Sequence, residues 1–568
     1  SATLDAAPVA ALLDDAPVVT SQGRSFPVTP HYLDRATPKG VRLESATAEL
    51  ILQALNETTG GMLVFLPGEG EIRRTAALIE GRLPADTVVR PLYGALPFAD
   101  QRRAIAPTKS GRKIVLSTSI AETSLTIEDI RVVIDAGRAR RARFDPASGM
   151  SRLVTEKVSK AEATQRAGRA GRVAPGDAYC LWTKGEHGAL PAFAPAEIEA
   201  ADLAGLALEL ATWGSDDLAF LTPPPVGALA EARSLLVSLG ALDADHRITA
   251  HGRALAALPL HPRLAHMLHR ACKQAAPLAA LLAARDPLRG APADLSLRIA
   301  ALRGRYDGPG TLQHAALAQI KAEIPRLAKG LPQAAPLSLG QQAALAYPDR
   351  VGIRRNGDDP RYVLSGGKGA VMDAADPLAG QRLIVTTDLD GDTREAKIRQ
   401  AVTISDRELR DLYADQIVWQ DICEWSKREG RVVARQQEVF GAVVLDDRIW
   451  ADAPPEAIAQ AMLDGVRQLG LRPSAAVQRF RARVALVDDL PAMDDESLLA
   501  KADIWLLPHL AGVRSTDDWK RFDLLPALRA MLDWEQTRQL DQAAPPHFTT
   551  PLGRKIPIDY DGEAPGIT

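Results

Sequence analysis

The chain has 568 residues, too long for one hydrophobic core, and a usual domain size of roughly 100–200 residues predicts three to five units. A formal net charge of −3, with 24% charged and 46% hydrophobic residues, is typical of globular proteins and excludes a globally basic nucleic-acid binder. Three scattered cysteines exclude a disulfide framework and predict no metal site. Without a secretory leader or an apolar run of about 18 residues, we expect a cytoplasmic protein with no membrane partner.

From residue 14 to residue 184, short apolar runs alternate with segments of helical periodicity. Four runs have the composition of buried strands, at residues 62–66, 88–92, 113–117 and 132–135. This alternation predicts an α/β domain with a parallel sheet and crossover helices. Ligands of such sheets bind beyond the carboxyl ends of the strands, so the loops at 67–70 and 118–120 are the first candidates for a site.

Two polar segments in this part of the chain have the chemistry of phosphate contacts. Residues 117–128 carry six hydroxyl side chains, more than the one or two that helix capping alone explains. In residues 165–172, Arg169 and Arg172 are three apart, so on a helix both guanidinium groups leave one face and meet one anion. Gln165 lies one turn earlier, where it could orient an attacking water. The alternative is a solvated arginine face on a surface helix.

A basic hairpin is predicted between these two segments. Two strand-like runs flank a turn at residues 145–149, and the first run contains four arginines, Arg138, Arg140, Arg141 and Arg143. These guanidinium groups suit the phosphate backbone of a nucleic acid. A charged edge strand that is protected from aggregation is the competing interpretation.

After residue 185 the pattern becomes helical and rich in Ala and Leu. We expect a small winged helix at 185–258, a helical bundle at 259–342, a β-barrel at 343–410 and a mixed α+β region at 411–568. Residues 388–392 resemble a calcium loop but lack its Gly and Glu, so they predict a hairpin turn. Residues 365–369 predict a turn between strands, and His266 and His269 are interpreted as ordinary helix residues.

The two phosphate-type segments together resemble motifs V and VI of superfamily 2 helicases. Their sequences, IAETSLTI and QRAGRAGR, are similar to those motifs in the DEAH/RHA branch. Residues 64–72 and 92–97 match two further motifs of that branch. Within it, residues 195–214, 222–225 and 258–264 and the C-terminal extension resemble the bacterial HrpB family. The resemblance implies a multidomain α/β plus α fold. Its expected order is the end of a first RecA-like domain (1–13), a second RecA-like domain (14–184), a winged helix (185–258), a helical ratchet-like bundle (259–342), an OB-like barrel (343–410) and an HrpB-type C-terminal domain (411–568).

The resemblance also implies roles for particular residues. Arg169 and Arg172 match the positions that face the γ-phosphate of ATP, with Gln165 beside the attacking water. Ser124 matches the serine that senses nucleotide state, and Glu128 the acidic residue that holds the ribose.

The expected RNA-facing residues come from the same comparison. Gly68 and Thr118 match positions that touch the RNA backbone, and the arginine hairpin matches a wedge against incoming duplex. Ser1, Ala2 and Thr3 match motif III, which couples the two sites at the end of the first RecA-like domain.

Neither a G-x-x-x-x-G-K-[S/T] phosphate loop nor a D-E-x-H motif occurs in the sequence. We therefore expect the first RecA-like domain to be missing, and with it most ligands of ATP and Mg²⁺. These 568 residues alone are then expected to be inactive.

The complete protein is expected to be an ATP-dependent RNA helicase that couples hydrolysis to translocation on, or unwinding of, RNA that is single-stranded or has duplex regions. The alternatives are a non-enzymatic RNA-binding or scaffold protein with a degenerate RecA-like fold, and a DNA helicase. The sequence leaves the natural RNA and the oligomeric state open.

Overall fold

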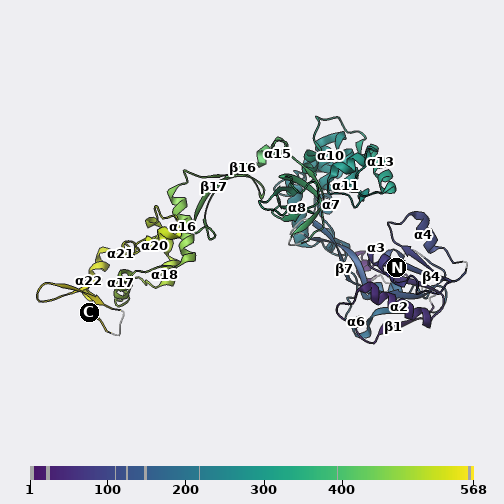
Figure 1. Cartoon of the computed structure of the whole chain (residues 1–568), viewed down its shortest axis with the longest axis horizontal. Coiled ribbons are helices and arrows are strands. Elements are labelled where there is room, and N and C mark those ends of the chain that lie inside the picture. Colours follow the sequence, from purple (N-terminus) through teal and green to yellow (C-terminus); the bar gives the residue numbers. More distant parts are fainter. Residues whose placement is uncertain are drawn as a thin grey trace. The chain divides into compact units, whose positions relative to one another are not determined.

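The computed structural model describes residues 6–20, 26–108, 110–122, 126–145, 150–215, 218–392, 395–560 and 564–567. The chain divides into two compact units, one of residues 1–350, 356–362 and 368–403 and one of residues 351–355, 363–367 and 404–568 (Figure 1). In the described ranges no helix has the length and apolar character needed to cross a membrane.

The first unit begins with helix α1 (Ala7–Leu12), followed by a six-stranded parallel sheet of order β1-β8-β5-β2-β4-β3. The strands are β1 (Val28–Leu33), β2 (Gly61–Phe65), β3 (Thr87–Leu92), β4 (Arg112–Ser117), β5 (Ile130–Asp135) and β8 (Gly176–Thr183). The four predicted apolar runs therefore coincide with β2 to β5, and the predicted α/β architecture is confirmed. Parallel strands buried on both faces read as continuous apolar runs, which is why the sequence showed them.

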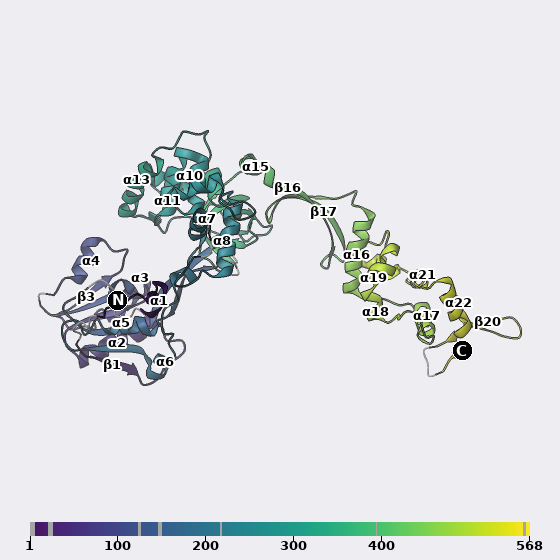
Figure 2. The ribbon, with the colours of Figure 1, turned by 180° about the vertical axis from the view of Figure 1, so that it is seen from behind.

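Helices cover both faces of the sheet (Figure 2). On one face, α2 (Leu43–Glu57) and α3 (Glu69–Ile79) pack against alternate residues of β2, β4 and β5, such as Met62 and Val64. On the other face, α4 (Phe98–Ile105) and the segments at 120–121, 127–130 and 167–170 pack against the intervening residues, such as Leu63 and Phe65. Residues that are one apart in β2 thus belong to different cores.

Between β5 and β8 the chain forms the predicted hairpin and a short helix. The hairpin strands are β6 (Arg138–Asp145) and β7 (Met150–Lys157), which pair antiparallel from Arg138↔Lys157 to Asp145↔Met150. Helix α5 (Lys160–Ala167) then leads to β8, and α6 (Lys184–Gly188) follows that strand.

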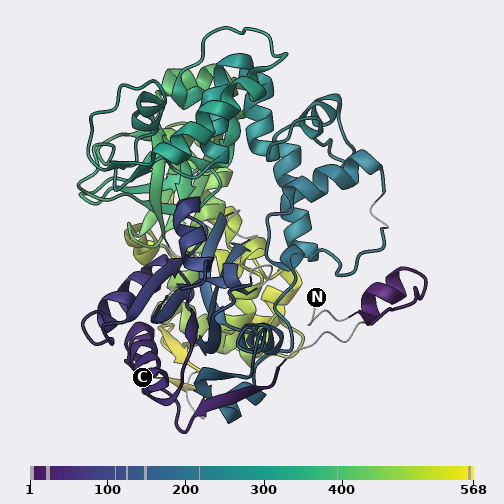
Figure 3. The same cartoon turned by 90° about the vertical axis from the view of Figure 1, so that its right-hand side faces the viewer.

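The rest of the first unit is mainly helical, in teal in Figure 3. Helices α7 to α9 and the bridge Leu242↔Ile248 share one core, as a winged helix requires. The helices and the short strands are α7 (Ala204–Trp213), α8 (Val226–Ser238), α9 (Ala250–Ala256), α10 (Pro262–Ala271), α11 (Ala276–Ala283), β9 (Leu288–Arg289), α12 (Leu295–Leu302), β10 (Thr311–Leu312), α13 (His314–Ala328) and α14 (Leu339–Ala346).

A closed five-stranded barrel of order β11-β12-β13-β15-β14 comes next. Its strands are β11 (Val351–Arg354), β12 (Arg361–Leu364), β13 (Gly369–Val371), β14 (Leu383–Leu389) and β15 (Ala396–Thr403). The predicted turn at 365–369 joins β12 to β13. The predicted turn at 388–392 starts too early, because β14 continues to Leu389, where the residue is paired with Ile398 and buried.

The second unit joins a three-stranded antiparallel sheet to a bundle of short helices with one core. Its elements are α15 (Asp406–Tyr413), β16 (Val418–Ser426), β17 (Arg431–Phe440), β18 (Val443–Ile449), α16 (Pro455–Leu469), α17 (Ala475–Ala485), α18 (Asp495–Ala500), α19 (Ala502–Trp505), α20 (Thr516–Arg521), α21 (Leu525–Arg529), α22 (Trp534–Ala543), β19 (His547–Thr549), β20 (Lys555–Asp559) and β21 (Gly566–Ile567).

One buried ion pair ties the start of α10 to the residues after α14. Arg263 donates to both carboxylate oxygens of Asp349, at 2.5 and 3.0 Å, and its guanidinium lies 5.4 Å from the centre of the Tyr347 ring. The Arg263 side chain is 7% exposed. A charge this deep is held by its partner, and removing it leaves the Asp349 carboxylate with the longer ion pair to Arg350 Nε at 3.9 Å.

We expect Arg263→Met to lower the free energy of unfolding of the first unit by about 3 kcal/mol, the lower end for a broken buried pair, because a third of Asp349 stays accessible. Urea denaturation would measure it. The exposed pair of Arg326 and Glu323 provides the control, since Arg326→Met should leave the transition in place. Equal effects of the two substitutions would contradict the assignment.

Candidate functional site

Helix α5 begins at a capping box that the sequence encodes as S-x-x-E. The Ser159 hydroxyl accepts from the backbone N–H of Glu162, while the Glu162 carboxylate accepts from the Ser159 backbone N–H at 2.7 Å and its hydroxyl at 2.8 Å. Both ends of this exchange satisfy donors that a helix start leaves open. The start of α5 is therefore fixed in place beside the hairpin.

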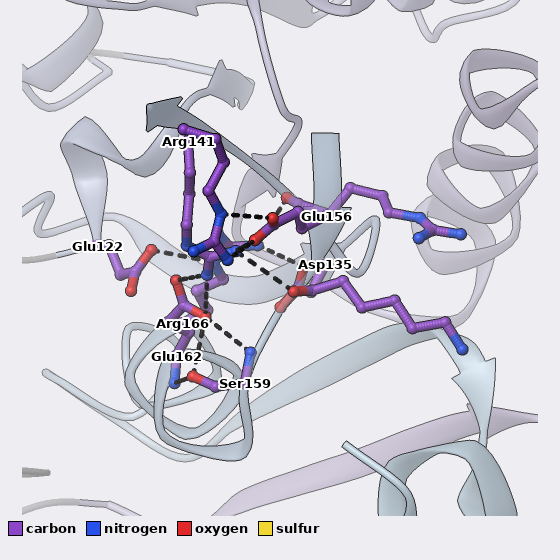
Figure 4. A network of polar contacts seen from close by, with 10 residues as sticks. Glu122, Asp135, Arg141, Glu156, Ser159, Glu162 and Arg166 are labelled. Atoms are coloured by element: carbon purple, nitrogen blue, oxygen red, sulfur yellow. Dashed lines mark hydrogen bonds and ion pairs between the residues drawn. The ribbon is translucent and has the colours of Figure 1, made fainter. Parts of the chain in front are cut away.

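The centre of the site is the buried guanidinium of Arg166, which is 1% exposed (Figure 4). It donates to Asp135 at 2.8 Å, to Glu122 at 3.2 Å and to the backbone carbonyl of Arg138 at 3.3 Å, and it lies 5.0 Å from the centre of the Phe65 ring. Glu122 follows β4, Asp135 ends β5 and Arg138 begins β6. One cation therefore joins four parts of the domain.

Burial and the charge of Arg166 act in opposite directions on the pKa of the two carboxyl groups around Arg166. Burial raises the pKa of Glu122 and of Asp135, although the Arg166 charge opposes both shifts. Asp135 also accepts from the backbone N–H of Gly137 at 2.8 Å through its Oδ1 atom. Without the guanidinium, both groups would bind protons more readily.

The arginine segment is not a continuous α-helix, and this corrects the sequence interpretation. Helix α5 ends at Ala167, and the next amides bond three residues back, from Arg169 to Arg166, Ala170 to Ala167 and Gly171 to Gly168. The two glycines favour this tightening because they add no side chain to it. The last of these bonds ends at Gly171, so Arg172 follows the turn directly.

The two candidate arginine fingers differ in exposure. Arg169 is 7% exposed and donates through Nε to the backbone carbonyl of Glu122 at 3.0 Å, whereas Arg172 is exposed. Burial, followed by the charge of Arg172, lowers the pKa of Arg169. The two cations thus lie close enough to repel, and an anion beside them would relieve that repulsion. Gln165 is half-buried in the last turn of α5.

The turn at residues 166–171, which we call the finger turn, is anchored to the sheet through Gly171. The Phe26 backbone N–H donates to the Gly171 carbonyl at 2.9 Å, and a Cβ on Gly171 would lie 2.5 Å from the Phe26 carbonyl oxygen and 2.7 Å from Val28 Cγ2. Backbone and strand β1 leave no space for a side chain there. The requirement for glycine at 171 therefore has a steric cause.

The two predicted backbone-binding positions lie at the carboxyl edge of the sheet. Gly68 caps α3 just after β2, and Thr118 follows β4, which pairs with β2 through Phe65↔Ser117. A Cβ on Gly68 would lie 2.5 Å from the guanidinium of Arg140, which bonds Glu71 at 3.2 Å. The structure thus brings Gly68 and the hairpin together.

The hairpin arginines are engaged by carboxylates in this structure. Arg141 bonds Glu162 at 2.5 and 2.6 Å and Glu156 at 3.3 Å, and Arg143 makes a two-pronged contact with Glu156 at 2.8 and 2.9 Å. Arg138 is half-buried at the start of β6. The hairpin is therefore a set of compensated cations.

The remaining candidates fall in two groups. Glu128 is exposed two residues before β5, and its backbone carbonyl accepts from Arg131 at 3.0 Å, so it lies toward the amino end of that strand. Ser124 and residues Ser1, Ala2 and Thr3 lie outside the described residues.

Sequence reasoning missed the acidic half of the site. Glu162 carried a readable signal, since a glutamate three residues after Ser159 is a capping-box pattern. Asp135 ends a buried strand, and Glu122 lies within the hydroxyl-rich segment. Neither sequence pattern predicts the ion pair that the side chain makes with Arg166. Arg166 was part of the arginine segment without a role of its own.

The cationic pair fits a polyphosphate. No group of three or more His, Cys, Asp or Glu side chains in the described part of the chain is placed to hold a metal ion. His251 and His266 instead bond each other at 2.8 Å, with the ring centres of His251 and His269 4.9 Å apart. Burial lowers the pKa of His266 to about 3, so this ring stays neutral near pH 7.

Four family models match parts of the chain. They are the helicase conserved C-terminal domain at residues 45–174, the winged-helix helicase-associated domain (HA2) at 232–260, the connector region of the ATP-dependent RNA helicase HrpB at 416–448 and the ATP-dependent helicase C-terminal model at 505–568. The first of these spans the sheet, the hairpin and the arginine turn.

Whole proteins are similar as well. The ATP-dependent RNA helicase HrpB of Escherichia coli (strain K12) is 39% identical over 585 residues, which cover 100% of this chain and 70% of that protein. The pre-mRNA-splicing factor ATP-dependent RNA helicase prp22 of Schizosaccharomyces pombe is 37% identical over 47% of this chain and 24% of that protein. A crystal structure of the E. coli DExH-box NTPase HrpB superposes with a TM-score of 0.71 at 38% identity, covering 100% of this chain and 71% of that one.

We expect Arg166→Gln to destabilise the first unit by about 3–5 kcal/mol at pH 8, because two buried carboxylates lose their cation. The loss should be smaller at pH 5. A carboxyl whose pKa is raised in the folded state retains a proton that the unfolded chain releases, so its contribution to stability falls as the pH rises through that window. Urea denaturation at both pH values measures the difference.

Arg82→Gln, which breaks an exposed pair with Glu49, should leave both curves near wild type. An equal loss at both pH values would show that the carboxylates do not carry the effect.

Proposed function

This chain belongs to the HrpB family of DEAH/RHA helicases, and on that premise we propose that it forms the finger-bearing half of an ATP-driven RNA motor. ATP would bind between the six-stranded sheet domain, which is the second RecA-like domain, and the first RecA-like domain. That first domain would carry the phosphate loop and the D-E-x-H motif, neither of which occurs in the 568 residues. Mg²⁺, held mainly by that other domain, would neutralise charge on the phosphates.

The nucleotide half of the proposal is carried by the exposed guanidinium of Arg172 beside that of Arg169. Charge builds up on the γ-phosphoryl oxygens during transfer, and a fixed guanidinium stabilises it without reorganisation. The backbone carbonyl of Glu122 orients Arg169, and the side chain of Glu122 accepts a hydrogen bond from Arg166. Gln165, in the last turn of α5, is proposed to orient the attacking water, while Ser124 and Glu128 would contact the nucleotide.

The RNA half is placed at the carboxyl edge of the same sheet. Gly68 and Thr118 would hold backbone phosphate through their main chain and hydroxyl, and the arginine hairpin would face an incoming duplex. In the sequence, the hairpin comes directly before α5, and the finger residues Arg169 and Arg172 come directly after it. Closure around ATP and release after hydrolysis would then move one set of backbone contacts relative to those of the other domain, with Ser1 to Thr3 as the coupling segment.

The remaining domains are assigned by the same reasoning. We propose that residues 185–258 form the winged helix, 259–342 the ratchet-like bundle, 343–410 the OB-like barrel and 411–568 the HrpB-type C-terminal domain, with 1–13 and 14–184 as the end of the first and the whole of the second RecA-like domain. Without the phosphate loop, the 568 residues alone should not hydrolyse ATP.

In a helicase that includes the phosphate-loop domain, we expect Arg172→Ala to lower the kcat of RNA-stimulated ATP hydrolysis about 10³-fold, the usual loss for an arginine finger. Steady-state ATPase assays would measure it, with the surface substitution Arg82→Ala as the matched control that stays at wild-type turnover. Unchanged activity in Arg172→Ala would favour the rival function, a non-enzymatic RNA-binding or scaffold protein.

The choice of nucleic acid is tested separately. Backbone contacts do not by themselves read the sugar, whereas a contact to the 2′-hydroxyl does. Stimulation of ATPase by an RNA strand but not by DNA of the same sequence is expected. Equal stimulation would favour a DNA helicase.

A further inference from the structure

The carboxylates on the hairpin arginines have the geometry of a bound phosphate. Arg143 presents Nε and Nη2 to the two oxygens of Glu156, and Arg141 presents Nη2 to both oxygens of Glu162. A guanidinium grips phosphate oxygens with a two-nitrogen fork such as that of Arg143, whereas Arg141 contacts Glu162 through Nη2 alone. The side chains that the proposed function assigns to RNA are thus occupied by the protein's own anions.

The Arg141–Glu162 pair can be exchanged at a lower cost than an ordinary buried pair. Both side chains are partly accessible, at 16% and 17%. If Arg141 leaves, the Glu162 carboxylate keeps the Ser159 backbone and hydroxyl donors of the capping box. The anion left behind is therefore still hydrogen-bonded, which removes much of the usual penalty for separating such a pair.

Glu162 differs from Glu156 in the element that carries it. Glu156 lies on β7 within the hairpin, whereas Glu162 lies in the first turn of α5, one turn before Arg166 (Figure 4). Its charge also contributes to raising the pKa of Glu122 and of Asp135. A change in the pairing of Glu162 is thus felt at the carboxylates that orient Arg166 and, through Glu122, at Arg169.

We propose that Glu162 is a positioning residue that occupies Arg141 until a phosphate of the RNA backbone replaces it, and that this exchange signals RNA binding through α5 to the finger turn. The inference rests on the proposed function. When RNA takes Arg141, the negative charge of Glu162 is no longer compensated by that arginine and acts on Arg166, one turn along the same helix, and on Glu122, whose backbone carbonyl orients Arg169.

The test uses Glu162→Gln, because glutamine at this position also closes a capping box and preserves the helix start. Binding of a fluorescent single-stranded oligo(U) is measured by anisotropy over a series of salt concentrations. We expect the variant to bind about fivefold more tightly, with a salt slope steeper by about 0.7, the value for one more phosphate contact on a single strand. In the helicase with its phosphate-loop domain, the ratio of RNA-stimulated to unstimulated ATPase should fall at the same time.

Tighter binding combined with weaker stimulation is the signature that a merely structural role would not produce. In an Arg141→Gln background, Glu162→Gln should have no effect on affinity, since the competition passes through that arginine. Glu156→Gln frees Arg143 and removes the longer 3.3 Å contact of Arg141 but keeps the Arg141–Glu162 pair, so it should tighten binding and leave the stimulation ratio unchanged. Glu49→Gln removes the carboxylate of a surface pair on α2 and should change neither quantity.

The outcomes separate this inference from the function it rests on. If wild-type protein binds the oligo(U) and Glu162→Gln leaves affinity and salt slope unchanged, the exchange is wrong and the helicase assignment stands. A gain that survives in the Arg141→Gln background also overturns it. If Glu162→Gln unfolds, the absence of any gain with Glu156→Gln rejects the competition between carboxylate and phosphate. Failure of the wild type to bind RNA rejects the proposed function itself.

Discussion

The guanidinium of Arg166 is the interaction on which the catalytic half of this domain depends. It is a full charge in an apolar setting, and its hydrogen bonds reach the end of β5, the start of the hairpin and the loop after β4. Removing a charge from water is expensive, so such a group is retained only where its partners are fixed. Because those partners come from separate segments, the domain cannot place its sheet edge, hairpin and α5 independently.

This arrangement gives two neighbouring arginines opposite properties. Arg166 is buried and bonded to two carboxylates, whereas Arg172, six residues later, is exposed to solvent. Between them, Arg169 is buried and is directed by the backbone carbonyl of Glu122. Within seven residues, arginine thus serves as a buried ion-pair partner at 166, as an oriented cation at 169 and as an exposed cation at 172, and the difference comes from what each side chain contacts.

The sequence predicted the sheet and the hairpin because their signals are local. Continuous apolar runs mark strands that are buried on both faces, as in β2, β4 and β5, and arginines around a turn mark the hairpin. It did not predict where α5 ends, because Arg169 and Arg172 fit either an α-helix or a tighter turn, and the choice is made by the docking of Gly171 on β1. It also missed Glu122 and Asp135, since partners of a buried cation are set by contacts across 31 and 44 residues. The roles of Gly68, Thr118, Ser124 and Glu128 came from family resemblance and stay predictions.

The fit of Gly171 against the start of β1 has a consequence for how this domain can evolve. The edge strand and the arginine turn share one steric boundary, so a larger residue at 171 requires that the backbone at Phe26 retreat. Strand β1 is joined to the sheet only through β8, the strand that directly follows the turn. Drift in the outermost strand is therefore transmitted to the cationic end of α5, which makes an apparently peripheral segment subject to the same selection as the chemistry.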